Sequence, residues 1–73
     1  MPLDITKQDR KRLKDIYDTS KNADHRIRAH AVLLAADGWS ERKIVEITFT
    51  EADFVADAIR RYKENGVDGL LTD

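Results

Sequence analysis

The placement of helix-breaking residues is the feature that most restricts the fold of this chain. Its only proline is Pro2, and its three glycines are Gly38, Gly66 and Gly69. Proline removes a backbone donor and glycine destabilises helices, so long segments that lack both residues favour helical structure. Two such segments exist, one between Pro2 and Gly38 and one between Gly38 and Gly66. The pattern predicts an all-α protein whose helices end near these glycines.

Capping residues and apolar spacing divide the two segments into four predicted helices. Thr6 and Ser40 can each cap a helix start by accepting a hydrogen bond from a backbone amide of the first turn. Gly38 and Gly66 suit the left-handed turn that ends a helix. A fifth helix is left open, and the segment after Gly66 is interpreted as a tail. The four helices are expected over about residues 6–19, 23–37, 40–47 and 50–65.

The start of the fourth predicted helix carries its own local signals. Thr50 is the expected capping residue, and Phe49 and Phe54 have the spacing of a hydrophobic staple around it. Trp39 has the same staple position before the third helix. These aromatic side chains are therefore interpreted as core or staple residues.

One predicted helix has an apolar surface on nearly every side. The segment Ala29–Ala36 contains only one polar residue, His30. A helix of this kind is normally central and touches several neighbours. With only 73 residues, the chain is expected to form a single domain with a small core, onto which Leu70 and Leu71 fold back.

Several functional classes are excluded by composition. The chain has no cysteine, and it contains no run of about 18 apolar residues and no signal peptide. His25 and His30 are five residues apart, so a helix places them on different faces and no metal site is expected. No nucleophile–base pair or phosphate loop is present. We therefore expect no cofactor, no small-molecule substrate, no membrane partner and a cytoplasmic location.

The last two predicted helices have the spacing of a helix-turn-helix. A short helix at 40–47 is followed by a tight turn and a longer helix at 50–65. In this motif the short helix lies across the longer one, whose outer face is free to enter the major groove of DNA. The spacing predicts a double-stranded DNA partner.

Two stretches, "AVLLAADGWSERKIVEI" and "FVADAIRRYKENGVDGL", resemble a known family. They are similar to the N-terminal, homeodomain-like helix-turn-helix domain of bacterial mariner-like insertion-sequence transposases. The similarity covers about residues 3–71, and its most specific parts are "LLAADG" at 33–38 and "RRYKENGVDGL" at 60–70. It implies sequence-specific binding to the terminal inverted repeats of a mobile element, in the bacterial nucleoid. In full-length relatives a carboxylate-triad catalytic domain follows. We expect that domain to be absent here, and the chain not to be an enzyme.

Charge separates this chain from that family. Residues 1–30 carry eight bases and five acids, whereas residues 31–73 carry five bases and nine acids. Relatives commonly have arginine or lysine where this chain has Ala56 and Asp57. Acids in the first turn of a helix also stabilise the helix itself, so Glu51 and Asp53 need no DNA to explain them. The candidate DNA-contacting positions are Arg42, Lys43, Ala56, Asp57, Arg60 and Arg61.

Two other functions stay open on the same scaffold. The acidic outer face of the fourth helix suits a basic protein partner, so a protein-interaction or homodimerisation module is an alternative. A stand-alone transcriptional regulator is a third hypothesis, which differs from a transposase domain mainly in its biological context.

Overall fold

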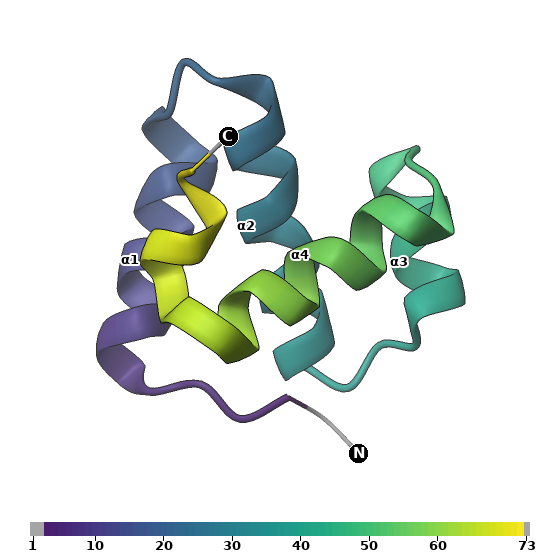
Figure 1. The fold of residues 1–73 in the computed structure, drawn as a ribbon, viewed down its shortest axis with the longest axis horizontal. Helices are drawn as coiled ribbons and strands as arrows, with labels where there is room; N and C mark the ends of the chain where they lie inside the picture. Colours follow the sequence, from purple (N-terminus) through teal and green to yellow (C-terminus); the bar gives the residue numbers. More distant parts are fainter. Residues whose placement is uncertain (1–2, 73) are drawn as a thin grey trace.

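The computed structural model describes residues 3–72, which form an all-α fold with four helices followed by a short 3-10 helix. The elements follow the chain order shown in Figure 1. They are α1 (Lys7–Thr19), α2 (Ala23–Ala36), α3 (Glu41–Thr48), α4 (Ala52–Asn65) and η1 (Gly66–Leu70).

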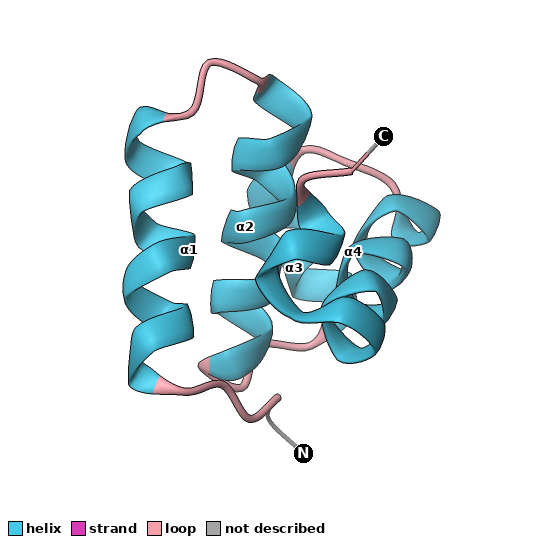
Figure 2. Cartoon of the chain, turned by 60° about the vertical axis from the view of Figure 1, so that its left-hand side comes forward, coloured by secondary structure: helices cyan, strands magenta, loops and turns pink. Residues whose placement is uncertain are grey.

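The helix α2 occupies the centre of the molecule. It lies beside α1, with which it forms an antiparallel hairpin (Figures 1 and 2), and it also contacts α3, α4 and η1. The prediction of a central helix is confirmed, because an apolar surface on several sides can be buried only by several neighbours. In Figure 1, α4 crosses in front of α2, and α3 lies at the far end of α4.

The core draws on every element of the fold. Leu70 at the end of η1 is fully buried, so the predicted folding back of the C-terminal tail is confirmed at that residue. The buried apolar side chains are Leu13, Ala29, Ala31, Val32, Ala35, Ile44, Val55, Ala58, Tyr62, Val67 and Leu70.

Most of the predicted helix boundaries rest on local hydrogen bonds that the structure contains. The Thr6 hydroxyl accepts from the amide of Asp9 at 3.0 Å, and the Ser40 hydroxyl accepts from the amide of Lys43 at 3.2 Å. Gly38 has a φ of 95°, a backbone conformation that glycine adopts without a steric penalty. These capping predictions are confirmed.

The predicted start of the fourth helix is wrong. The N-cap of α4 is Glu51 rather than Thr50, and no side chain caps it. The Thr50 hydroxyl instead lies 2.7 Å from that of Thr48. Phe49 is the left-handed residue that ends α3, with a φ of 56°, and it is 94% exposed. Because the left-handed turn points this ring into solvent, the predicted staple with Phe54 does not form.

Candidate nucleic-acid interface

The outward face of α4 is defined by which of its residues reach solvent. Helical geometry places residues three or four apart on one side, and one such line stays exposed along the whole helix. It consists of Ala52, Ala56 and Arg60, and it ends at Lys63 and Glu64. The opposite side is buried and consists of Val55, Ala58 and Tyr62. The outward line therefore changes from small apolar side chains to charged ones in the direction of the chain, with two cations, Arg60 and Lys63, and one acid, Glu64.

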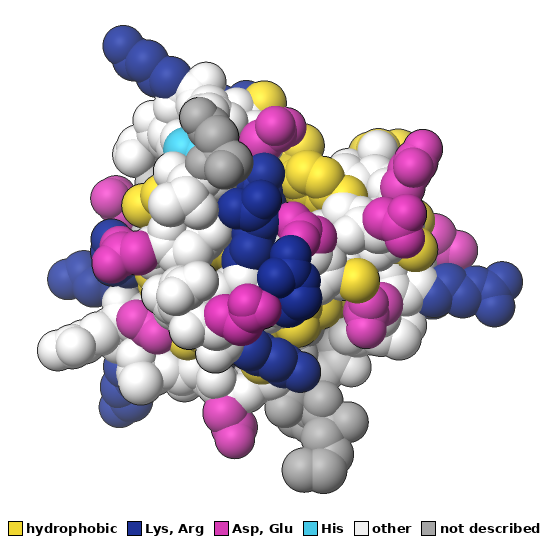
Figure 3. Space-filling model, viewed as in Figure 1, with side chains coloured by type: hydrophobic (Ala, Val, Ile, Leu, Met, Phe, Trp, Pro, Cys, Tyr) yellow, Lys and Arg dark blue, Asp and Glu magenta, His cyan; other side chains and the backbone are white. Residues whose placement is uncertain are grey.

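Acidic side chains lie at the start and along one side of α4. Glu51 and Asp53 are exposed in its first turn. In Figure 3, Lys and Arg side chains form a column down the middle of the view, with Asp and Glu side chains between them and more acids over the α3–α4 end. The electrostatic field of this face is consequently mixed, with its positive part over the C-terminal half of α4.

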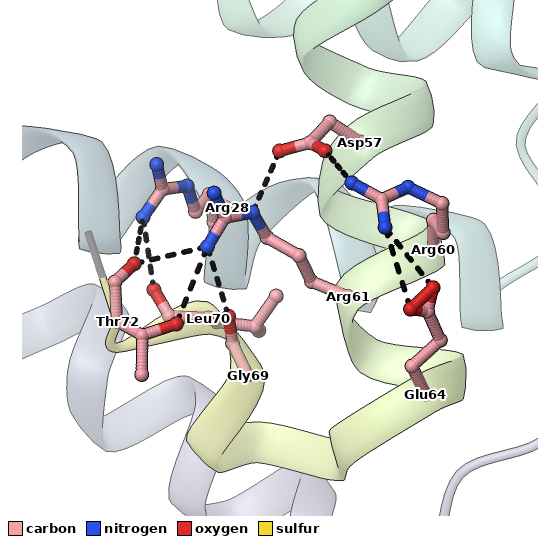
Figure 4. A network of polar contacts seen from close by, with 8 residues as sticks. All are labelled: Arg28, Asp57, Arg60, Arg61, Glu64, Gly69, Leu70 and Thr72. Atoms are coloured by element: carbon pink, nitrogen blue, oxygen red, sulfur yellow. Dashed lines mark hydrogen bonds and ion pairs between the residues drawn. The ribbon is translucent and has the colours of Figure 1, made fainter.

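Arg60 and Asp57 belong to one network of ion pairs (Figure 4). Arg60 donates to the two carboxylate oxygens of Glu64 at 3.0 and 3.3 Å and also contacts Asp57. Asp57 accepts from Nε of Arg61 at 2.7 Å. Hydrogen bonds from Arg61 and then from Arg60 hold the pKa of the Asp57 carboxyl below its ordinary value. The negative charge of Asp57 thus offsets part of the positive charge of Arg60 and Arg61.

Arg61 points away from the outward line and toward the C-terminal turn. Its side chain is only 24% exposed. Its guanidinium donates to the carbonyls of Thr72 at 3.0 Å and Gly69 at 3.4 Å. Arg28 on α2 donates to the carbonyl of Leu70 at 3.1 Å, next to these contacts in Figure 4. The two arginines together hold the end of the described chain against α2 and α4.

The first turn of α3 borders the outward face of α4. A shallow groove between them is lined by Glu41, Ala56, Ile59, Arg60, Lys63 and Glu64. Arg42 and Lys43 follow Glu41 in the chain and are exposed. Lys43 pairs with Glu46 at 3.3 Å, whereas Arg42 forms no ion pair within residues 3–72. Arg42 is thus available to a ligand without breaking an internal contact.

The C-terminal half of α4 is held by a contact that joins distant parts of the sequence. The Tyr62 hydroxyl donates to Oδ2 of Asp9 on α1 at 2.6 Å. Burial, followed by this carboxylate, raises the pKa of Tyr62 to about 12. The bond fixes the position of α4 relative to α1.

Of the six candidate positions, Arg42, Lys43, Ala56 and Arg60 are exposed and Asp57 is half-buried, whereas Arg61, although on α4, bonds to the C-terminal turn. The outward-facing Lys63 was not among the candidates. Helical spacing alone could have identified it, since it lies one turn beyond Arg60. The role of Arg28 had no local signal, because the carbonyl that it binds is 42 residues away.

Within residues 3–72, no three potential metal-binding side chains come together. None of the helices described is both long and apolar enough to span a membrane.

A comparison with protein families supports the helix-turn-helix assignment. A family model described as a homeodomain-like domain matches residues 22–71, which run from the residue before α2 to the residue after η1. No curated protein and no solved structure matches the chain. The match includes α3, α4 and the shallow groove between them.

Proposed function

Since the chain belongs to the homeodomain-like family, we propose that it binds double-stranded DNA and places α4 in the major groove. The family points to DNA as the partner. The architecture supports this docking, because α3 lies against α4 and leaves one side of α4 in solvent. Small domains of this fold are typically non-catalytic, and the proposal includes no chemical step.

The observation that carries the proposal is the group of cations at one end of the outward face. Arg60 and Lys63 are exposed on α4, and Arg42 is exposed on the first turn of α3. Cationic side chains at these places can contact phosphates on the walls of a groove that holds α4. Arg60 would exchange its bonds to Asp57 and Glu64 for a phosphate, so its contribution is smaller than that of an unpaired arginine.

The target proposed is the terminal inverted repeat of a mobile element. The support is the similarity of residues 33–38 and 60–70 to the transposase domains named above. A DNA ligand would place the protein at the bacterial nucleoid. Selection from a pool of random duplexes tests the target, because the enriched sequences should match the ends of mobile elements.

The binding itself is tested by fluorescence anisotropy with a labelled duplex at several salt concentrations. Each neutralised phosphate contributes about −0.9 to the slope of log K against log salt, so three contacts predict a slope of about −3. Lys63→Gln should make the slope shallower by about 0.9. Lys21→Gln is the matched control, since Lys21 is exposed in the α1–α2 connection. Absence of binding at low salt would refute the proposal.

A protein partner is the second candidate function, and two neighbouring features favour it. Phe49 is 94% exposed on the α3–α4 turn. A shallow groove near this turn is lined by four acids, by no base and by two apolar residues. The acids repel phosphates and suit a basic polypeptide. Its lining residues are Asp24, Ile27, Thr50, Glu51, Asp53, Phe54 and Asp57.

Sedimentation velocity and the DNA titration together separate these functions. A monomer that binds DNA with a steep salt dependence supports the first. A domain that does not bind DNA at low salt supports the second, a protein partner. Self-association that is lost in Phe49→Ala would identify a homodimer, although acids facing acids across a two-fold axis oppose that arrangement.

A further inference from the structure

The first half of the outward line of α4 is apolar. Ala52 and Ala56 are both exposed, and Ile59 is half-buried on the neighbouring side. None of these side chains has a donor or an acceptor. In helix-turn-helix proteins the N-terminal residues of the recognition helix are those that contact base edges. On the outward line, the base-reading positions of α4 are therefore occupied by methyl groups, with the exposed acid Asp53 beside them.

Alanine methyl groups restrict which bases can be recognised. Hydrogen-bonded readout of a base edge requires a polar side chain, whereas an alanine contacts the C5-methyl group that thymine presents in the major groove. We propose that Ala52 and Ala56 read pyrimidine C5-methyl groups, so that the preferred DNA carries thymine or 5-methylcytosine opposite the first half of α4. This inference rests on the DNA-binding function proposed above.

Two acids lie near the two alanines, and they differ in whether they are free to contact a base. The Asp57 carboxylate is occupied by Arg60 and Arg61. The exposed Asp53 lies about 60° around the helix from Ala56, at about 100° per residue, and is the competing reader that the d(G-C) duplex tests. An alanine also has no long side chain that holds the backbone away from the bases, so α4 can approach closely enough for methyl contact. The result is a surface that distinguishes bases by shape.

The test compares the affinity of the full chain for four alternating duplexes. They are d(A-T), d(A-U), d(G-C) and d(G-C) with 5-methylcytosine. Uracil differs from thymine only by the missing methyl group. We expect d(A-T) to bind tighter than d(A-U) by about fourfold per methyl contact, the effect of burying one methyl-sized group. A matching gain from 5-methylcytosine would identify any C5-methyl as the ligand. A gain with thymine alone would identify thymine as its source.

Serine variants connect the effect to the two alanines. Ala52→Ser and Ala56→Ser should each lower the thymine-to-uracil affinity ratio. The double variant should bring this ratio to about one, since no methyl contact is left to distinguish the two bases. Ala23→Ser is the matched control, because Ala23 is exposed at the start of α2, away from α4. The ratio is taken within each variant, so a small loss of folded protein cancels.

Three results overturn the inference, and they differ in whether the proposed DNA binding is kept. Equal affinity for d(A-T) and d(A-U), with salt-dependent binding to both, would remove methyl readout and keep DNA binding. Tightest binding to unmethylated d(G-C) would also keep DNA binding, but it would identify Asp53 as the base reader in place of the alanines, because its carboxylate can accept a bond from cytosine N4. Absence of binding to all four duplexes at low salt would refute DNA binding itself.

Discussion

The two ends of α4 differ in how the rest of the molecule holds them. At the C-terminal end, Tyr62 bonds to α1, Arg61 bonds to the carbonyl of Thr72, and Gly69 packs closely against the helix backbone. At the N-terminal end, Glu51 provides no side-chain cap, and the preceding Phe49 is both left-handed and exposed. Stabilising contacts are concentrated at one end and unfavourable local features at the other.

This difference shows how a small domain can separate stability from the surface that it presents. The C-terminal half of α4 contains the side-chain hydrogen bonds to α1 and to the C-terminal turn, which help to determine its position. The N-terminal half of α4 lies at the exposed end, where local opening requires less free energy. Substitutions at the two ends should therefore change stability in opposite directions.

The largest effect is expected for Gly69→Ala at the C-terminal end. An added Cβ would lie 2.5 Å from the carbonyl oxygen of Arg61 and 3.0 Å from Cβ of Asn65. A backbone oxygen cannot move without disturbing α4, so we expect a loss of about 3 kcal/mol, the upper part of the range for overpacking. Urea denaturation measures this loss.

Gly66→Ala is the matched control for Gly69→Ala. Nothing lies within 4 Å of a Cβ at Gly66, but its φ of 68° is unfavourable for alanine. This variant should lose about 2 kcal/mol from backbone strain alone, because a φ of 68° with a ψ of −155° is a conformation that essentially only glycine adopts. A loss in Gly69→Ala that is no larger than this would mean that a small shift relieves the close approach at Gly69.

The second effect concerns Tyr62→Phe, which removes the bond to Asp9 and keeps the ring. A hydrogen bond to a charged group contributes about 1.5–3 kcal/mol, and we expect the lower value because Asp9 can rehydrate. Chemical denaturation measures the change. An unaltered free energy of unfolding would show that α1 and α4 are held by apolar packing alone.

The same bond predicts a dependence on alkaline pH. Because the pKa of Tyr62 is raised from 10.0 to about 12, the folded state keeps its proton after the unfolded chain has lost it. The stabilisation is complete below pH 10 and is lost as the pH rises toward 12. Melting temperatures of the native chain and of Tyr62→Phe should therefore converge over this interval.

The third effect has the opposite sign and lies at the N-terminal end. Phe49→Gly should stabilise the protein by about 1 kcal/mol, because glycine adopts the left-handed conformation without steric cost. The ring is exposed, so little packing is lost. Phe49→Ala removes the ring and keeps the unfavourable backbone, so thermal unfolding should place its stability below that of Phe49→Gly. The reverse order would contradict the assignment of strain.

The smallest effect is expected for Glu51→Ser at the N-cap of α4. A serine hydroxyl can accept from a first-turn amide, which should stabilise the helix by about 0.5 kcal/mol after the loss of the favourable acid. Glu51→Ala removes the acid without adding a cap and should be the least stable of the three in a denaturant titration. A serine variant that is no more stable than the alanine variant would show that the missing side-chain cap does not limit the stability of the N-terminal end of α4.

Sequence reasoning succeeded where the controlling contacts are a few residues apart. The caps at Thr6 and Ser40 and the turn at Gly38 depend on spacings visible in the chain. It failed at Thr50, where two adjacent residues compete to begin α4. Which of the two residues begins α4 depends on Phe49, where the backbone is left-handed and turns from α3 into α4. Phenylalanine rarely adopts this conformation, so the sequence did not indicate the turn.

By itself, the sequence determined that the chain is helical, that α2 is central and that a short and a long helix follow each other, because apolar period and capping are local properties. Only the tertiary structure decided which charges face outward. Arg60 and Arg61 are neighbours and look alike in sequence, yet the helix turns about 100° between them. Arg61 turns to the carbonyls of the C-terminal turn, which packing places beside α4, whereas Arg60 stays in solvent. That packing depends on contacts across the whole chain, which no local pattern contains.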